Sequence, residues 1–145
     1  VLAEFLRDNN IKADGCIVGE PTGMTVWTGH KGRSEYHVRV RGKAVHSSCA
    51  LTDQGCNAID YATKFIAKIR EIGEEFRRSG HRDKDFHVPF TTLSTNLIKG
   101  GNAVNTVPAE CEFSFEFRNL PQDTAATIDG RLRSYVDNEL LPAMR

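Results

Sequence analysis

The sequence predicts an α+β fold of the ferredoxin-like kind, a two-layer sandwich in which two helices cover one face of an antiparallel sheet. From about residue 33 onward the hydrophobic pattern gives the order strand, helix, strand, strand, helix. This is the split βαβ order of ferredoxin-like folds without its last strand. Each helical segment carries a single apolar stripe, as helices that pack on one face of a sheet must.

Two strongly alternating segments supply the main strands. Apolar residues alternate with charged ones over residues 34–41 and again over residues 110–118. Alternation with a period of two predicts half-buried strands that have one apolar and one charged face. A third strand with weaker alternation is expected over residues 90–99. The apolar residues that form the buried face of the sheet are Tyr36, Val38, Val40, Cys111, Phe113, Phe115 and Phe117.

The helices are expected over residues 57–79 and 124–144. In both segments apolar residues recur at spacings of three and four, which places them on one helix face. Asn57 can cap the first helix, and Asp60 in its first turn favours the helix dipole. Gly80 follows the end of that helix.

The beginning of the chain, up to residue 28, follows a different pattern. Residues 1–9 resemble the end of a helix, residues 16–18 a short buried strand, and residues 25–28 a further strand-like segment. A helix followed by a short apolar strand is typical of an α/β sheet. We therefore expect the beginning of the chain to be the tail of a neighbouring domain, and the chain to be a piece of a longer polypeptide.

Composition narrows the class of protein. The 145 residues are 39% hydrophobic and 26% charged, with a formal net charge of zero. Zero net charge argues against nucleic-acid or membrane-surface partners, and no apolar run approaches the length of about 20 residues that a membrane helix needs. The spacing of the four cysteines fits neither a zinc finger nor a disulfide framework, which favours a reducing cytoplasm.

Two residues at turns are candidates for chemistry. Glu20 follows the expected strand at residues 16–18 and precedes a proline, so its carboxylate is placed to bind a metal ion; the alternative is an ordinary surface glutamate. His46 lies among small and hydroxyl residues that leave its ring free to reach a ligand. The alternative for His46 is a histidine that only satisfies a turn.

Two further candidates lie near the last predicted strand. Asn105 ends a glycine-rich loop at residues 100–105 and could donate its amide N–H to a developing oxyanion, or could simply favour a tight turn. Arg118 lies on the polar face at the end of the strand. Its guanidinium can bind a carboxylate through two hydrogen bonds, and the alternative is pairing with a glutamate of the sheet.

An ordered set of short motifs resembles a known family. The motifs are GEPT (19–22), HKG (30–32), GKAVHSS (42–48), GCNAI (55–59), GGNAVNTVP (100–108), and FR and LP (117–118 and 120–121). Together they resemble the lid, or dimerisation, domain of the co-catalytic zinc amidohydrolases of the acetylornithine deacetylase and succinyl-diaminopimelate desuccinylase family. Residues 88–93, VPFTTL, together with GEPT, are most similar to the bacterial acetylornithine deacetylase branch.

The resemblance implies a domain division and a role for each candidate. It implies that residues 1–24 end a catalytic domain and form the hinge, and that residues 25–145 form the lid domain without its last strand. The implied roles are as follows: metal ligand, Glu20; binding of the substrate carbonyl and its oxyanion in the partner subunit's active site, His46; substrate binding, Asn105 and Arg118. The other ligands of two zinc ions and the general base would lie outside this chain.

The function that the resemblance implies is zinc-dependent removal of the acyl group from an N-acyl amino acid by a cytoplasmic homodimer. N-acetylornithine deacetylation in arginine biosynthesis is the expected reaction. This chain alone would then be inactive and bind zinc weakly or not at all. The alternatives are a desuccinylase or related metallopeptidase, and a stand-alone ferredoxin-like binding module.

Overall fold

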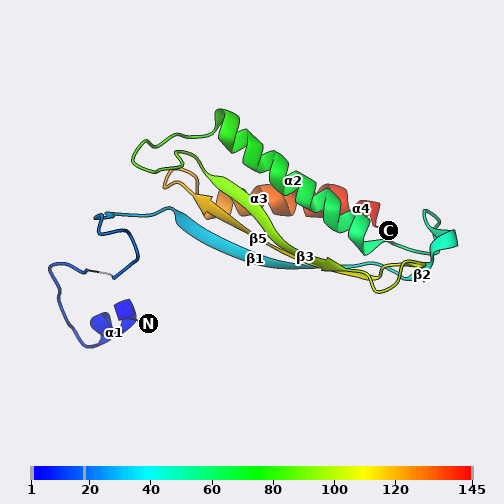
Figure 1. The fold of residues 1–145 in the computed structure, drawn as a ribbon, viewed down its shortest axis with the longest axis horizontal. Coiled ribbons are helices and arrows are strands. Elements are labelled where there is room, and N and C mark those ends of the chain that lie inside the picture. Colours follow the sequence, from blue (N-terminus) through cyan, green and yellow to red (C-terminus); the bar gives the residue numbers. More distant parts are fainter. Residues whose placement is uncertain (1, 18, 145) are drawn as a thin grey trace.

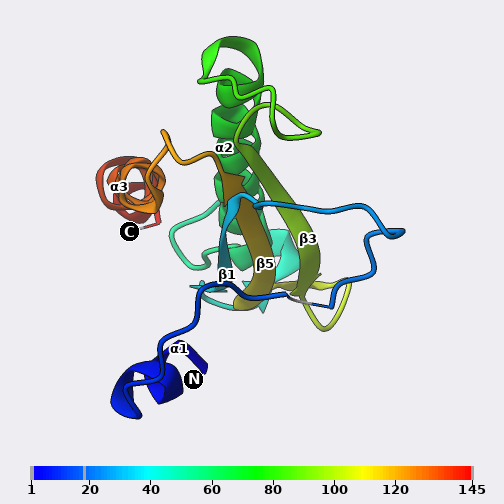
Figure 2. The same cartoon turned by 90° about the vertical axis from the view of Figure 1, so that its left-hand side faces the viewer.

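The computed structural model describes residues 2–17 and 19–144, and its main body is the predicted two-layer sandwich. Three antiparallel strands form the sheet in the order β1-β5-β3 within the described residues. Two helical segments lie side by side on one face of this sheet (Figures 1 and 2). The elements of the body are β1 (Gly32–Arg41), α2 (Ala58–Ser79), β3 (Thr92–Gly100), β5 (Glu110–Asn119) and α3 (Ala125–Tyr135).

The core lies between the sheet and the helices and is built on the aromatic residues of β5. Phe113 and Phe117 are completely buried, and Tyr36 of β1 stacks on Phe115 with ring centroids 4.8 Å apart. Phe65 of α2 packs edge-on against Phe113 from the helix layer. The alternation in the sequence therefore predicted both the strands and the direction in which their side chains face.

The ends of the helices follow the local sequence. The side chain of Asn57 accepts hydrogen bonds from the backbone N–H groups of Ile59 and Asp60, so the predicted cap of α2 is confirmed. Thr124 caps α3 in the same way by accepting from the N–H of Thr127. Each helix thus begins one residue after its expected start, and the expected first residue is its N-cap.

The second helix contains an irregularity that the pattern did not predict. A π-helical stretch, η2 (Val136–Leu140), separates α3 from the short α4 (Leu141–Ala143). The N–H of Leu141 bonds to the carbonyl of Val136, five residues earlier. Pro142 follows at once, and proline in a helix cannot donate a hydrogen bond and clashes with the carbonyl four residues before it. The wider turn accommodates that proline.

A small second sheet forms the tip of the molecule. It pairs β2 (Val45–His46) with β4 (Thr106–Val107) and lies beyond the ends of β1 and β3 that are farthest from the N-terminus (Figure 1). The sequence pattern did not predict these strands, because two-residue strands carry no measurable alternation. A single turn of 3-10 helix, η1 (Ser47–Cys49), follows β2 directly.

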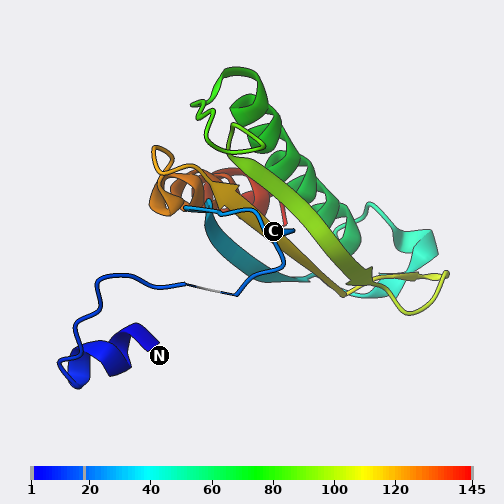
Figure 3. The same ribbon diagram turned by 60° about the vertical axis from the view of Figure 1, so that its left-hand side comes forward.

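The N-terminal segment differs from its prediction. The helix α1 (Leu2–Asp8) is present and lies apart from the sheet (Figure 3), but residues 16–17 and 25–28 form no strand, and Ile17 is fully exposed. Val18, the last residue of the first expected strand, lies outside the described residues. An extended segment becomes a strand only beside another strand that satisfies its backbone hydrogen bonds, and the described part of the chain places none there. Among the described helices, none is long and apolar enough to cross a membrane.

Candidate functional site

His46 and Asn105 lie next to each other at the tip. His46 is the last residue of β2 and pairs with Thr106 of β4, and the N–H of Ser47 donates to the carbonyl of Asn105 over 2.9 Å. Both His46 and Asn105 are exposed. The structure therefore brings together two candidates that are 59 positions apart in the sequence, at the end of the molecule farthest from the N-terminal segment.

Two glycines make close contacts where the tip joins the body. A Cβ atom on Gly42 would lie 2.0 Å from the carbonyl oxygen of Cys56, and one on Gly55 would lie 2.2 Å from a methyl group of Val45. Lys43 and Cys56 exchange backbone hydrogen bonds between these glycines, with N–O distances of 2.8 and 2.9 Å. The glycines of two of the short motifs thus allow the approach that positions β2 and His46.

The ring of His46 is fixed by its own turn. Its Nδ1 accepts a hydrogen bond from the backbone N–H of Ser48 over 3.2 Å and lies 2.8 Å from the Ser48 hydroxyl. Within the described part of the chain its Nε2 makes no hydrogen bond, so that atom is available to a ligand. A histidine that can donate from Nε2 beside an asparagine amide is a suitable pair for stabilising negative charge on a carbonyl oxygen.

Arg118 lies at the opposite end of the sheet from the tip. It is the ninth residue of the ten-residue strand β5, which begins near the tip, so it is about 30 Å away along the strand at about 3.3 Å per residue (Figure 1). No small substrate could contact His46 and Arg118 of the same chain over this distance. The two ends of the sheet can therefore serve only separate sites.

The guanidinium of Arg118 is bound to Glu116, two residues earlier on the same face of β5. Its Nε donates to one Glu116 oxygen over 3.0 Å, and Arg33 of the neighbouring strand donates from its Nε to the other over 3.0 Å. Hydrogen bonds from Arg118 and then from Arg33 lower the pKa of the Glu116 carboxyl, and Glu116 in turn raises the pKa of Arg33. The glutamate partner that was the alternative for Arg118 is thus present, although it lies on the same strand.

Glu20 stands apart from the other candidates. It lies in the extended N-terminal segment with an exposed side chain, and among the described residues its one hydrogen bond runs from the N–H of Thr22 to its backbone carbonyl. In the described ranges, no three histidine, cysteine, aspartate or glutamate side chains form a group that could hold a metal ion. Glu20 could therefore supply one metal ligand at most, and its companions would lie outside the described residues.

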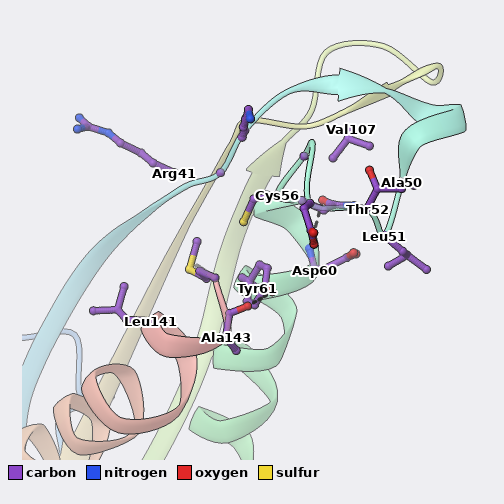
Figure 4. Close-up of a pocket in the computed structure, with 16 residues that line it drawn as sticks. Arg41, Ala50, Leu51, Thr52, Cys56, Asp60, Tyr61, Val107, Leu141 and Ala143 are labelled. Atoms are coloured by element: carbon purple, nitrogen blue, oxygen red, sulfur yellow. Dashed lines mark hydrogen bonds between the residues drawn. The ribbon is translucent and has the colours of Figure 1, made fainter.

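No sequence pattern indicates the hollow that lies beside the tip. It has a volume of about 810 Å³ and is bounded by the end of β1, the loop after η1, the start of α2 and the C-terminal turn (Figure 4). Its lining includes two cationic side chains, Arg41 and Lys43, and two carboxylates, Asp53 and Asp60. None of the four candidate residues lines it. Such a hollow has no sequence signal because it is assembled from four separate parts of the chain.

Comparison with known proteins identifies relatives of this chain. A family model described as a peptidase dimerisation domain matches residues 28–144. Acetylornithine deacetylase of Pasteurella multocida is 34% identical over 117 residues, which are 81% of this chain and 30% of that protein. Acetylornithine deacetylase of Photorhabdus laumondii is 33% identical over 141 residues, which are 97% of this chain and 34% of that protein.

Solved structures share the fold at lower sequence identity. An amidase of the hydantoinase/carbamoylase family from Burkholderia multivorans matches 79% of this chain and 25% of its own, with a TM-score of 0.62 and 20% identity. The aminobenzoyl-glutamate utilization protein from Klebsiella pneumoniae matches 78% of this chain and 26% of its own, with a TM-score of 0.56 and 16% identity. The chain thus spans about one third of the length of the curated relatives that it matches.

Proposed function

This chain belongs to the peptidase dimerisation domain family, and we propose that it is the lid and dimerisation part of a longer hydrolase that removes the acyl group from an N-acyl amino acid. N-acetylornithine is the proposed substrate, because the relatives from Pasteurella multocida and Photorhabdus laumondii, 34% and 33% identical to this chain, are named acetylornithine deacetylase. The pathway served would be arginine biosynthesis.

The observation that carries the proposal is the position of His46 and Asn105 at an exposed tip. The hinge at the other end of the body would join this domain to the catalytic domain of its own chain. The tip is then remote from that hinge and is best placed to reach the active site of a partner subunit. We assign His46 and Asn105 to that partner's site, and Arg118, near the hinge, to the site of its own subunit.

In the proposed reaction, His46 and Asn105 would donate hydrogen bonds to the amide oxygen of the substrate. That oxygen gains negative charge when the amide carbon is attacked, and prearranged donors stabilise the charge most when water is excluded. Arg118 would bind a substrate carboxylate with the N–H groups that Glu116 leaves free. Zinc enters the proposal only through Glu20, as one ligand whose companions would lie in the rest of the enzyme.

The same reasoning supports a division of the chain and a homodimer. Residues 1–24 would belong to the catalytic domain, since α1 and the segment after it lie apart from the sheet and the family match begins at residue 28. Residues 25–145 would form the lid. Two copies would associate through the lid, so that each tip reaches the other subunit.

Turnover by the full-length protein that contains this chain tests the proposal. We expect it to hydrolyse N-acetylornithine faster than N-succinyl-diaminopimelate. His46→Ala should lower kcat by about 10²- to 10³-fold, as the loss of one oxyanion donor does elsewhere, with the metal content unchanged. Ser47→Ala is the matched control, since the Ser47 side chain makes no hydrogen bond within the described residues. Unchanged turnover in His46→Ala, or loss of its metal, would contradict the assignment.

A further inference from the structure

We propose that Ser48 is a positioning residue that holds the neutral imidazole of His46 in the tautomer with its proton on Nε2. Two groups of Ser48 lie against the same ring nitrogen. The backbone N–H is 3.2 Å from His46 Nδ1, and the hydroxyl oxygen is 2.8 Å from it. The assignment of the tautomer rests on this geometry alone, whereas its role in catalysis rests on the proposed function.

The backbone contact decides where the ring proton lies. A peptide N–H can only donate a hydrogen bond, so Nδ1 must present its lone pair to it. A neutral imidazole carries a single N–H, which is therefore on Nε2. The Ser48 hydroxyl can also turn its hydrogen toward Nδ1 and strengthen the same arrangement.

The surrounding turn holds both partners in place. His46 is the N-cap of η1, with φ −58° and ψ 141°, and the N–H of Ala50 bonds to the carbonyl of Ser47 over 3.1 Å. The N–H of Ser47 in turn donates to the backbone carbonyl of Asn105, the residue just before β4. The ring, Ser48 and the neighbouring asparagine are thus parts of one hydrogen-bonded tip.

Two other histidines of the chain have the opposite arrangement. Nδ1 of His30 lies 2.9 Å from the carbonyl oxygen of Lys31, and Nδ1 of His81 lies 2.7 Å from a carboxylate oxygen of Asp123. Both partners are acceptors, so these two rings must carry a proton on Nδ1. The chain therefore contains its own spectroscopic references for the tautomer with the proton on Nδ1, against which His46 can be compared.

The consequence for the proposed reaction concerns the atom that faces the substrate. With the proton on Nε2, His46 donates to the developing oxyanion; with the proton on Nδ1, the same position would present a lone pair and repel it. Ser48 would thus act through His46 without contacting the substrate.

Nitrogen NMR of the ¹⁵N-labelled 145-residue chain tests the proposal. Long-range ¹H–¹⁵N correlation spectra recorded at about pH 8.5, where an ordinary histidine is neutral, separate protonated from unprotonated ring nitrogens by their chemical shifts. We expect His46 to show a protonated Nε2 and an unprotonated Nδ1, with His30 and His81 reversed. A protonated Nδ1 in His46, or shifts averaged between the two forms, would overturn the proposal.

Two variants separate the part played by Ser48 from general effects on the tip. Ser48→Ala removes the hydroxyl but keeps the backbone N–H, so the His46 nitrogen shifts should move part of the way toward the averaged values of a free imidazole, whereas Ser47→Ala should leave them unchanged. Unaltered shifts in Ser48→Ala would show that the hydroxyl has no part in holding the ring and would overturn the positioning role of the Ser48 side chain. In the full-length enzyme Ser48→Ala should lower kcat about tenfold at constant KM, as the loss of a partner of a functional histidine does. If that enzyme hydrolyses no N-acyl amino acid, the proposed function fails while the NMR result stands.

Discussion

Arg118 shows how a side chain can be predicted correctly in position and only partly in its contacts. Strand parity placed it on the polar face at the end of its strand, and it lies there. The same parity places Glu116 on that face two residues earlier, and the register brings Arg33 opposite Arg118. Which carboxylate Arg118 binds depends on rotamers, which the sequence pattern does not contain. Nε and Nη2 of Arg118 donate to the Glu116 carboxylate. Within the described residues no group accepts from Nη1, so this atom is left for a ligand.

We predict that the contribution of Glu116 to stability depends on pH. Its pKa is lowered from the ordinary value of 4.5 by the hydrogen bonds of Arg118 and Arg33. A carboxyl group with a lowered pKa in the folded state stabilises the protein fully above the ordinary pKa and loses this effect as the pH falls through the lowered value. Glu116→Gln should therefore reduce the free energy of unfolding at about pH 7, by at most about 1 kcal/mol for such partly exposed ion pairs.

Urea unfolding of the wild type and of Glu116→Gln at about pH 7 and about pH 3 measures the difference in their free energies of unfolding. This difference should shrink at the acidic pH. Glu110→Gln is a control on the same strand, where the carboxylate lies 3.7 Å from Arg39 in a looser contact. We expect a smaller effect there. A difference for Glu116→Gln that is constant across the two pH values would contradict the prediction.

His46 and Asn105 were recognisable as candidates, but their proximity was not. Each belongs to a glycine-containing motif, and that chemistry is visible in the sequence. The contact between them depends on two-residue strands and on the tautomer-fixing turn at Ser48, which are too short to leave a periodic signal. Glu20 remains a prediction, because within the described residues its segment forms no backbone hydrogen bond with the other candidates.

At the scale of secondary structure, prediction succeeded where an element has a long face to bury. β1, β5 and α2 each extend over at least ten residues and carry a clear pattern of apolar positions. It failed at residues 16–17 and 25–28, which have no neighbouring strand in the described part of the chain. It also missed η2, because a π turn depends on where Pro142 falls within the helix and leaves the apolar stripe in place.

The close approach at Gly42 leads to a prediction about the element that carries His46. A methyl group at this position would lie 2.0 Å from the carbonyl oxygen of Cys56 and 3.0 Å from the backbone nitrogen of Ala58. Backbone atoms cannot give way as a flexible side chain can, so the tip must shift away from the body. Gly42→Ala should lower the free energy of unfolding by about 1–3 kcal/mol or more, the cost of overpacking.

Gly130→Ala is the matched control for this substitution. Gly130 lies exposed in α3, and nothing is within 4 Å of a Cβ atom built on it. Alanine is the better helix former, so this change should raise stability by about 0.4–1 kcal/mol. Chemical denaturation of both variants measures the contrast, and a Gly42→Ala protein as stable as the wild type would show that the tip tolerates the methyl group.

At the scale of the whole molecule, the two edges of the sheet are unequal. β1 presents charged side chains along its outer face, Arg33, Glu35, His37, Arg39 and Arg41, and charges on an edge strand discourage pairing. β3 instead exposes Leu97 and Ile98, with 68% and 56% of their surface accessible. A groove of about 410 Å³ between α2 and β3 runs beside this edge. The strand that the ferredoxin-like order lacks would pair with β1, which leaves the β3 edge for the proposed homodimer.

We therefore predict that the chain dimerises through the β3 edge. The double substitution of Leu97→Lys and Ile98→Lys should raise the dissociation constant of the dimer at least about tenfold, equivalent to 1.4 kcal/mol, because it places two charges where the second copy would pack. Val104→Lys, at a fully exposed apolar residue of the tip, is the control and should leave the dimer intact. Size-exclusion chromatography with light scattering over a range of concentrations gives the masses. A wild-type chain that stays monomeric at high concentration, or a double variant that dimerises as well as the wild type, would exclude this edge as the interface, and with it the route by which one tip reaches the other subunit.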